Sequence, residues 1–65
     1  MPMEVPKRWY VELEPGVWLT EGEGDPPRTL DVQFAASWRS LMEAERHLVV
    51  ARRFRPFLNA QIHHI

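Results

Sequence analysis

One stretch in the second half of the chain, residues 40–54, constrains the fold more than any other. It contains neither glycine nor proline, and most of its residues are good or tolerable helix formers. Ser40 is followed three residues later by Glu43, the capping-box spacing in which each side chain can satisfy a free amide of the first turn. Arginines near the end suit the negative pole of the helix dipole, and Pro56 disfavours helical backbone just before it. The sequence therefore predicts a helix with its N-cap at Ser40 that ends near Phe54.

Two stripes of side chains run along this predicted helix. At about 100° per residue, one stripe has the spacing of a buried face and contains Leu41, Ala44, Leu48 and Ala51. A ladder on the far side mixes apolar and basic groups and contains Met42, Arg46, Val49 and Arg53. We expect the first stripe to pack on a sheet and the ladder to contact an acidic partner. The alternative is that the apolar members of the ladder are single exposed hydrophobes without a function.

The length of 65 residues and the absence of cysteine limit the chain to one small domain held by packing alone. A chain of this size buries only about 60% of its unfolded surface, so a core and a substrate-sized cavity do not both fit. The strong metal ligands are His47, His63 and His64, and the two adjacent histidines would point to opposite faces of a strand. We therefore expect no metal site, no cofactor and no catalytic residue.

The first residues show little pattern. Residues 1–7 contain two prolines and lack the basic and apolar regions of a secretory signal, and we expect a flexible N-terminus there, followed by a single domain over residues 8–65. No apolar run approaches the roughly 18 residues that a membrane span requires. The expectation is a cytoplasmic protein that does not enter a membrane.

The next two segments have the period of strands. Residues 8–14 alternate between apolar and polar side chains, and residues 17–21 predict a second strand. Between them, Pro15 and Gly16 suit the two central positions of a type II turn. The apolar side of the first strand contains Trp9, Val11 and Leu13.

The register of this hairpin depends on its loop and stays open. A tight two-residue loop places Trp18 and Thr20 on the apolar side of the sheet, whereas one extra loop residue places Val17 and Leu19 there. If Trp18 is exposed, it becomes an aromatic anchor of the kind that dominates interfaces.

The middle of the chain predicts a loop and an ambiguous segment. Residues 22–28 combine two glycines, two prolines and three charges, and we expect a surface loop that buries nothing. In residues 30–38 apolar side chains recur at every second position, which taken alone predicts a strand. The alternative is a helical turn over residues 31–35, capped by Thr29 or Asp31, with a very short strand over the last three residues.

After the helix, residues 57–65 predict a last strand that pairs with the hairpin and has Leu58, Ala60 and Ile62 on one side. The order is thus strand, strand, a short third strand or turn, helix, strand. We predict an α+β fold in which one helix packs on one face of a small antiparallel sheet of three or four strands.

A set of spaced residues runs from the hairpin into the helix: Trp9-Tyr10-Val11, then Asp31, Ala35, Trp38, Ser40, Glu43, Ala44 and Leu48. This arrangement resembles a pattern in small phage and prophage proteins of unknown function, where a polar turn leads to an aromatic residue, a Ser or Thr cap and a helix rich in Glu and Ala. The resemblance covers roughly residues 8–62 and implies a hairpin, a helix and a further strand. It carries over no catalytic or ligand-binding residue.

Charge is divided unevenly along the chain. Residues 1–31 hold seven acids and three bases, and residues 32–65 hold two acids and five bases, so the halves carry −4 and +3. Nucleic-acid binding would use Trp38 or Tyr10 as a stacking surface together with the bases of the second half, Arg39, Arg46, Arg52, Arg53 and Arg55. The net charge of −1 and the single lysine argue against it.

These patterns predict a non-catalytic interaction module that binds a protein partner or a second copy of itself. The last strand carries no charged residue or proline that would block edge pairing, so a homodimer through that strand is the first mechanism. The second mechanism uses the helix ladder of Met42, Arg46, Val49 and Arg53, which would receive an acidic partner. Trp18 is a separate binding candidate on the sheet if the hairpin register exposes it. Nucleic-acid binding through the arginines is the alternative function.

Overall fold

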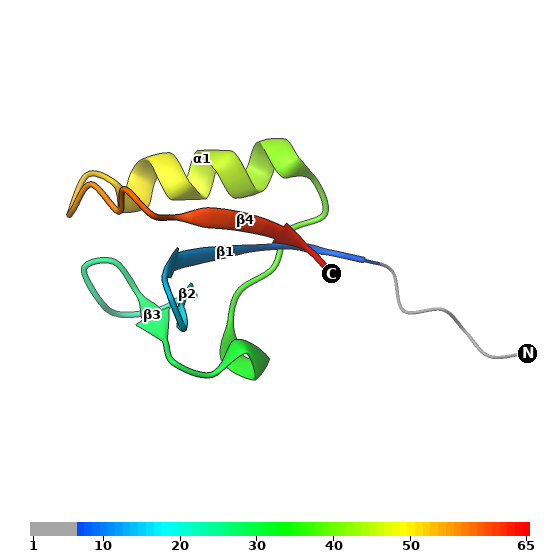
Figure 1. Cartoon of the computed structure of the whole chain (residues 1–65), viewed down its shortest axis with the longest axis horizontal. Coiled ribbons are helices and arrows are strands. Elements are labelled where there is room, and N and C mark those ends of the chain that lie inside the picture. Colours follow the sequence, from blue (N-terminus) through cyan, green and yellow to red (C-terminus); the bar gives the residue numbers. More distant parts are fainter. Residues whose placement is uncertain (1–6) are drawn as a thin grey trace, which may run out of the picture.

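The alternation in residues 9–14 makes this segment the central strand of an antiparallel sheet (Figure 1). The computed structural model describes residues 7–65. Its strands are β1 (Trp9–Glu14), β2 (Val17–Leu19), β3 (Arg28–Thr29) and β4 (Gln61–His64), in the spatial order β3-β2-β1-β4. The helix α1 (Leu41–Ala51) covers one face, and the 3-10 turn η1 (Val32–Phe34) lies on the other side of the sheet (Figure 1). The predicted α+β class and element order are confirmed, while the predicted flexible N-terminus falls on residues 1–6, outside the described residues, and on Lys7.

The core lies between the sheet and α1. Val11 and Leu13 of β1 are fully buried, as the alternation predicted. They meet Ala44, Leu48 and Ala51 of α1, and small residues on the helix allow a close approach to the sheet. The buried cluster is completed by Leu19, Trp38 and Phe57.

The hairpin of β1 and β2 contains an irregularity beside its turn. Gly16 has a φ of 78°, the value needed at the second central position of the predicted type II turn. Glu14 lies opposite Val17, but the next pair is Glu12 with Trp18, so β1 contains one extra residue at this point.

This bulge decides which side chains face the helix. Leu19 is buried against α1, and Trp18 lies on the opposite face of the sheet. The structure thus has the second of the two registers that the sequence left open, reached by a bulge in β1 rather than by an extra loop residue. β2 also ends at Leu19, earlier than predicted, because the chain turns at Thr20, whose amide donates to the Pro27 carbonyl.

The helix begins as predicted and ends early. Ser40 is the N-cap, with its side chain accepting from the Glu43 amide at 3.2 Å, while the Glu43 carboxylate accepts from the Arg39 amide. The prediction that α1 ends near Phe54 is wrong, since the last helical residue is Ala51. Two i to i+3 hydrogen bonds tighten the chain after it into a turn. Leu41, expected on the buried stripe, is 40% exposed because it lies at the end of the helix.

The ambiguous segment follows the alternative prediction. Asp31 caps η1 by accepting from the Gln33 amide at 2.9 Å. The segment then reaches Trp38, which forms an isolated antiparallel bridge with Trp9. The third strand lies earlier than expected, in Arg28 and Thr29, because the chain returns along β2 immediately after the loop.

Two further expectations are wrong. The loop after β2 does bury a side chain, since Pro26 is fully buried. The last strand begins only at Gln61, so Leu58 is 86% exposed in the turn before it and the buried residue is Phe57. Phe57 has a φ of 47°, which turns the chain back toward β4 and points this ring inward.

Candidate interaction surfaces

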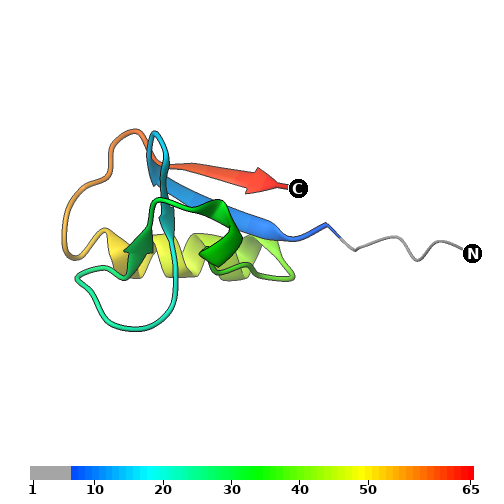
Figure 2. The same ribbon diagram turned by 90° about the horizontal axis from the view of Figure 1, so that it is seen from below.

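The face of the sheet opposite α1 carries an aromatic and polar cluster, which we name the open sheet face: Tyr10, Glu12, Trp18 and His63 (sheet viewed from this side in Figure 2). The His63 atom Nε2 lies 3.0 Å from Oε1 of Glu12 and donates to it when that nitrogen carries the proton. The rings of Trp18 and His63 are tilted at a centroid distance of 5.3 Å. Trp18, a predicted site residue, is therefore half-buried and already has an aromatic neighbour.

Two hydrogen bonds to its carboxylate stabilise the charged form of Glu12. The Gly16 amide donates to Oε2 at 3.1 Å, and His63 contacts the other oxygen. The Gly16 bond, followed by the His63 contact, lowers the pKa of Glu12 below its ordinary value. Glu12 is thus held as an anion that closes the turn and orients the histidine on β4.

The outer edge of β4 has no neighbouring strand within residues 7–65. Arg8 and Ile65 exchange two backbone hydrogen bonds, at 2.9 and 3.0 Å. Hydrogen-bonded and non-hydrogen-bonded pairs alternate along an antiparallel ladder, so the amides and carbonyls of Ile62 and His64 point away from β1. These groups form a free edge, as the sequence analysis expected for the last strand.

The predicted ladder on the helix is largely exposed, but it is shorter than expected. Met42 is 69% exposed and Val49 is 59% exposed, and Arg46 lies between them on α1. Arg53 does not continue the ladder, because α1 ends before it and its amide bonds instead to the Val50 carbonyl. The structure therefore brings together three of these four residues on one helix face and leaves Trp18 on the far side of the sheet.

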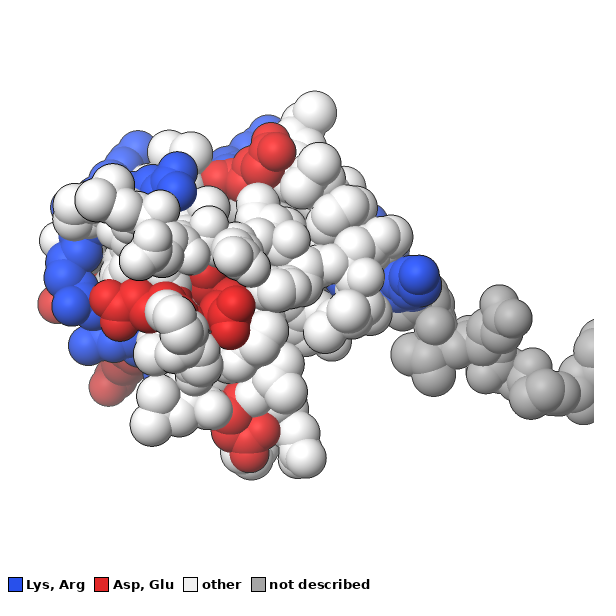
Figure 3. Space-filling model, in the orientation of Figure 1, with Lys and Arg blue, Asp and Glu red and all other residues white. Residues whose placement is uncertain are grey.

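The arginines of the nucleic-acid alternative do not form a uniform basic surface. Figure 3 shows basic side chains at the end of the molecule where α1 ends, with acidic side chains beside them. Nη2 of Arg55 lies 3.9 Å from Oε1 of Glu14. Nε of Arg52 donates a hydrogen bond to the Pro56 carbonyl. Arg39 lies at the opposite end of the helix, before the N-cap. Two of the five arginines thus already have partners within the fold.

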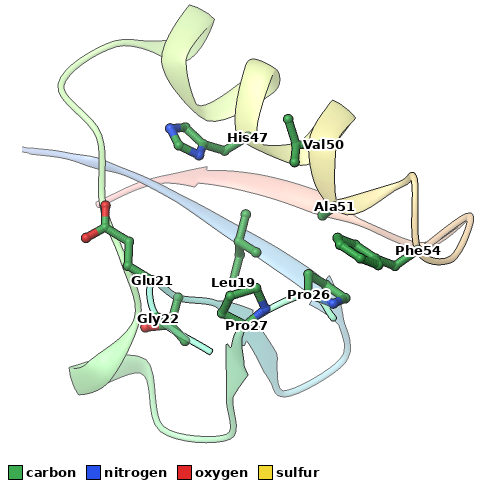
Figure 4. Close-up of a pocket in the computed structure, with 10 residues that line it drawn as sticks. Leu19, Glu21, Gly22, Pro26, Pro27, His47, Val50, Ala51 and Phe54 are labelled. Atoms are coloured by element: carbon green, nitrogen blue, oxygen red, sulfur yellow. The ribbon is translucent and has the colours of Figure 1, made fainter. Parts of the chain in front are cut away.

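A pocket lies between α1 and the loop after β2, and we name it the helix–loop pocket (Figure 4). Its volume is about 220 Å³. Most of its wall is apolar and is formed by Leu19, Pro26, Pro27, Val50, Ala51 and Phe54. Figure 4 shows Glu21 and His47 at one end and Phe54 at the other.

The polar end of the pocket is formed by His47 and Glu21. His47 stacks on the ring of Trp38 at a centroid distance of 4.5 Å, which holds the imidazole beside the pocket. Glu21 is exposed, and no ion pair to its carboxylate is present in residues 7–65. The pocket therefore combines an apolar lining with an exposed acidic residue at one end.

Sequence reasoning missed this pocket. Residues 22–28 form a loop whose composition predicts that it buries nothing, but its two adjacent prolines are compact apolar groups that line the pocket. His47, Val50 and Phe54 are spaced three and then four residues apart, and this spacing is the signal in the sequence that could have indicated a shared surface on α1 and the turn after it. The pairing of Glu12 with His63 was also missed, because it required the register of both neighbouring strands.

Within the described residues, no three side chains of the metal-ligating types gather into a group. No helix of residues 7–65 combines the length and apolar character needed to cross a membrane. Comparison with known proteins found no family model, curated protein or solved structure that matches the chain. The resemblance to small phage proteins consequently stays a prediction.

Proposed function

We propose that this protein is a cytoplasmic, non-catalytic interaction module that pairs strand to strand through β4. The observation that supports the proposal is the free edge of β4, where the amides and carbonyls of Ile62 and His64 point outward. Natural proteins usually protect such edges with charges, prolines or covering segments. Within residues 7–65, no proline, no Asp, Glu, Lys or Arg and no further strand protects β4, and the other edge of the sheet, β3, has only two residues.

The partner that fits this edge most simply is a second copy of β4. In an antiparallel arrangement about a two-fold axis at His63, Ile62 of each copy would pair with His64 of the other. Such pairing supplies four backbone hydrogen bonds and joins the two sheets. The strand is short, so we expect a small interface and a dissociation constant on the order of 100 μM.

The test is a concentration series by analytical ultracentrifugation with two proline variants. Ile62→Pro removes an outward amide and breaks no backbone hydrogen bond to β1, so it should give a folded monomer. Its stability should be lower than that of the wild type, because the Ile62 side chain is partly buried and packs on the core. His63→Pro is the matched control, since it removes an amide that points toward β1 and should unfold the chain. Circular dichroism of both variants separates loss of association from loss of fold.

Hydrogen exchange provides a measurement without substitution. At high protein concentration the amides of Ile62 and His64 should become protected, whereas the His63 amide should be protected at every concentration. A protein that stays monomeric up to about 1 mM, with fast exchange at Ile62 and His64, contradicts self-pairing.

Nucleic-acid binding remains the second candidate. It is supported by the exposed basic residues around the end of α1. Its observable is binding of single-stranded DNA that weakens steeply as salt increases. The absence of binding at low salt would exclude it.

A further inference from the structure

We propose that the helix–loop pocket is a second binding site, which takes one bulky apolar side chain of a partner peptide whose neighbouring residue is basic. This inference does not rest on strand pairing, because the pocket lies beside β2 and α1, whereas β4 is the opposite edge of the sheet. The occupant is deduced from three properties of the pocket: its size, its lining and the charge at its mouth.

The size selects a single side chain. Pockets for drug-sized ligands and cofactors typically measure about 300 to 1,000 Å³. The helix–loop pocket measures about 220 Å³, which is too small for such a ligand. A single aromatic or large aliphatic side chain fits this volume.

The lining favours an apolar group. Leu19 and Ala51 are buried residues at the base of the pocket, and Val50 and Phe54 are 44% and 48% exposed. An apolar side chain that entered would remove these partly exposed surfaces from water, which is favourable in proportion to the apolar area buried. Thr20 offers little to a polar ligand, since its hydroxyl already donates to the Phe34 carbonyl at 2.8 Å.

The charge at the mouth favours a basic neighbour. Residues 20–27 contain Glu21, Glu23 and Asp25 and no basic residue, and all three acids are exposed. Of the arginines that follow α1, Arg52 and Arg55 are engaged with groups that do not line the pocket. Of the three acids, Glu21 lines the pocket, while Arg28 at the end of the loop donates to the Pro26 carbonyl at 2.9 Å. A cation beside the apolar anchor would meet Glu21, and complementary charges set orientation and specificity at interfaces.

The experiment titrates the ¹⁵N-labelled full chain with three blocked peptides: acetyl-Arg-Phe-Arg-amide, acetyl-Glu-Phe-Glu-amide and acetyl-Arg-Ala-Arg-amide. The basic phenylalanine peptide should shift the amide resonances of Leu19, Val50 and Phe54 saturably, with a dissociation constant of about 1 mM. The acidic peptide should bind about two- to fivefold more weakly, the size expected for exposed charge pairs. The alanine peptide should bind at least about tenfold more weakly, because it lacks the apolar anchor.

Matched variants locate the site. Val50→Phe fills the pocket from a partly exposed position and should weaken binding about tenfold or more. Val49→Phe makes the same change outside the pocket and should leave binding unchanged. Glu21→Lys should abolish the preference for the basic over the acidic phenylalanine peptide. It should keep the preference for phenylalanine over alanine.

Four outcomes of the peptide titrations would overturn the proposal. These are no saturable shift up to about 10 mM peptide, equal binding of the alanine peptide, equal weakening by both valine variants, and no effect of Glu21→Lys on charge preference. If the amide resonances of the pocket residues shift when protein concentration alone is raised, a second copy of the chain occupies the pocket. That result also overturns the proposal that the occupant is a partner peptide. Strand pairing at β4 is read separately from the exchange of the Ile62 amide, so either proposal can fail alone.

Discussion

At the scale of single residues, Pro15 explains the register of the sheet. The turns that match the twist of a two-residue hairpin require a positive φ at the first central position, which proline cannot adopt. The chain forms a type II turn instead, with Gly16 at a φ of 78°, and the mismatch is absorbed by the bulge in β1. Because a shift of one residue exchanges the two faces of a strand, this proline decides that Trp18 lies away from the helix.

Glu12 gives a prediction about pH. Its pKa is lowered in the folded chain, first by the Gly16 hydrogen bond and then by His63. On acidification the unfolded chain takes up the proton before the folded chain does. The stabilisation is therefore complete above the unfolded pKa of Glu12 and is lost as pH falls through its lower folded pKa. Glu12→Gln should lower the melting temperature near neutral pH, with a difference that disappears in acid.

Melting curves by circular dichroism between neutral pH and strong acid measure this effect. The matched control is Glu23→Gln, which removes the same charge from an exposed loop position and should change stability little. An unchanged difference between the wild type and Glu12→Gln across the whole pH range would contradict the assignment.

At the scale of elements, the start and the end of α1 were not equally predictable from the sequence. The start of α1 follows from a local signal, since Ser40 and Glu43 carry the capping pattern in the sequence itself. Its end does not, because Arg52, Arg53 and Phe54 are acceptable helix formers. The chain leaves the helix so that Phe57 can enter the core, a tertiary requirement that no local pattern contains.

The loop between β2 and β3 gives a prediction with an internal control. Gly22 and Gly24 have φ values of 117° and 138°, which strain any other residue. A Cβ at Gly24 would lie 2.8 Å from the Pro27 Cα, whereas at Gly22 it would meet nothing within 4 Å. Gly22→Ala should cost about 1 to 2 kcal/mol from backbone strain alone, and Gly24→Ala should cost about 1 to 3 kcal/mol more through overpacking.

Urea unfolding monitored by tryptophan fluorescence gives the free energy of unfolding of both glycine variants. Equal losses for the two variants would show that the contact with Pro27 does not hold the loop in place. Because Pro27 lines the helix–loop pocket, peptide binding by Gly24→Ala should fall together with its stability.

At the scale of the whole molecule, eight buried hydrophobic residues hold the fold within residues 7–65. The core of a domain of this size rarely supplies more than roughly 3 to 5 kcal/mol of stability. Leu48 is 7% exposed at the centre of the interface between α1 and the sheet. Leu48→Ala should cost about 2 to 5 kcal/mol, enough to unfold much of the population.

Val49→Ala is the matched control, since the neighbouring side chain is 59% exposed and its truncation should stay within about 0.5 kcal/mol. Thermal unfolding monitored by circular dichroism compares the two variants. A cooperative transition of Leu48→Ala near the wild-type temperature would contradict the assigned core.

The fold class was predictable because each element carries its own period, from the alternation of β1 to the stripe of α1. The surfaces were only partly predictable. Met42 and Val49 are exposed as expected from the helical wheel alone, and β4 is at an edge as expected from its composition. The helix–loop pocket requires Pro26 and Phe54 to approach from distant parts of the chain, and the pair of Glu12 and His63 joins residues 51 positions apart. Contacts between residues so far apart in the chain depend on tertiary packing, which cannot be deduced from a single sequence.

The position of β1 in the sheet has a consequence for the order of folding. Its two neighbours are β2, reached through a two-residue turn, and β4, which follows about fifty residues later. The hairpin can close while the chain is being synthesised, but Val11 cannot be fully enclosed until β4 leaves the ribosome. Closing so long a loop is the entropically costly step. Until then one side of the nascent strand is open to pairing with other chains, so the protein depends on late residues for its protection against misassembly.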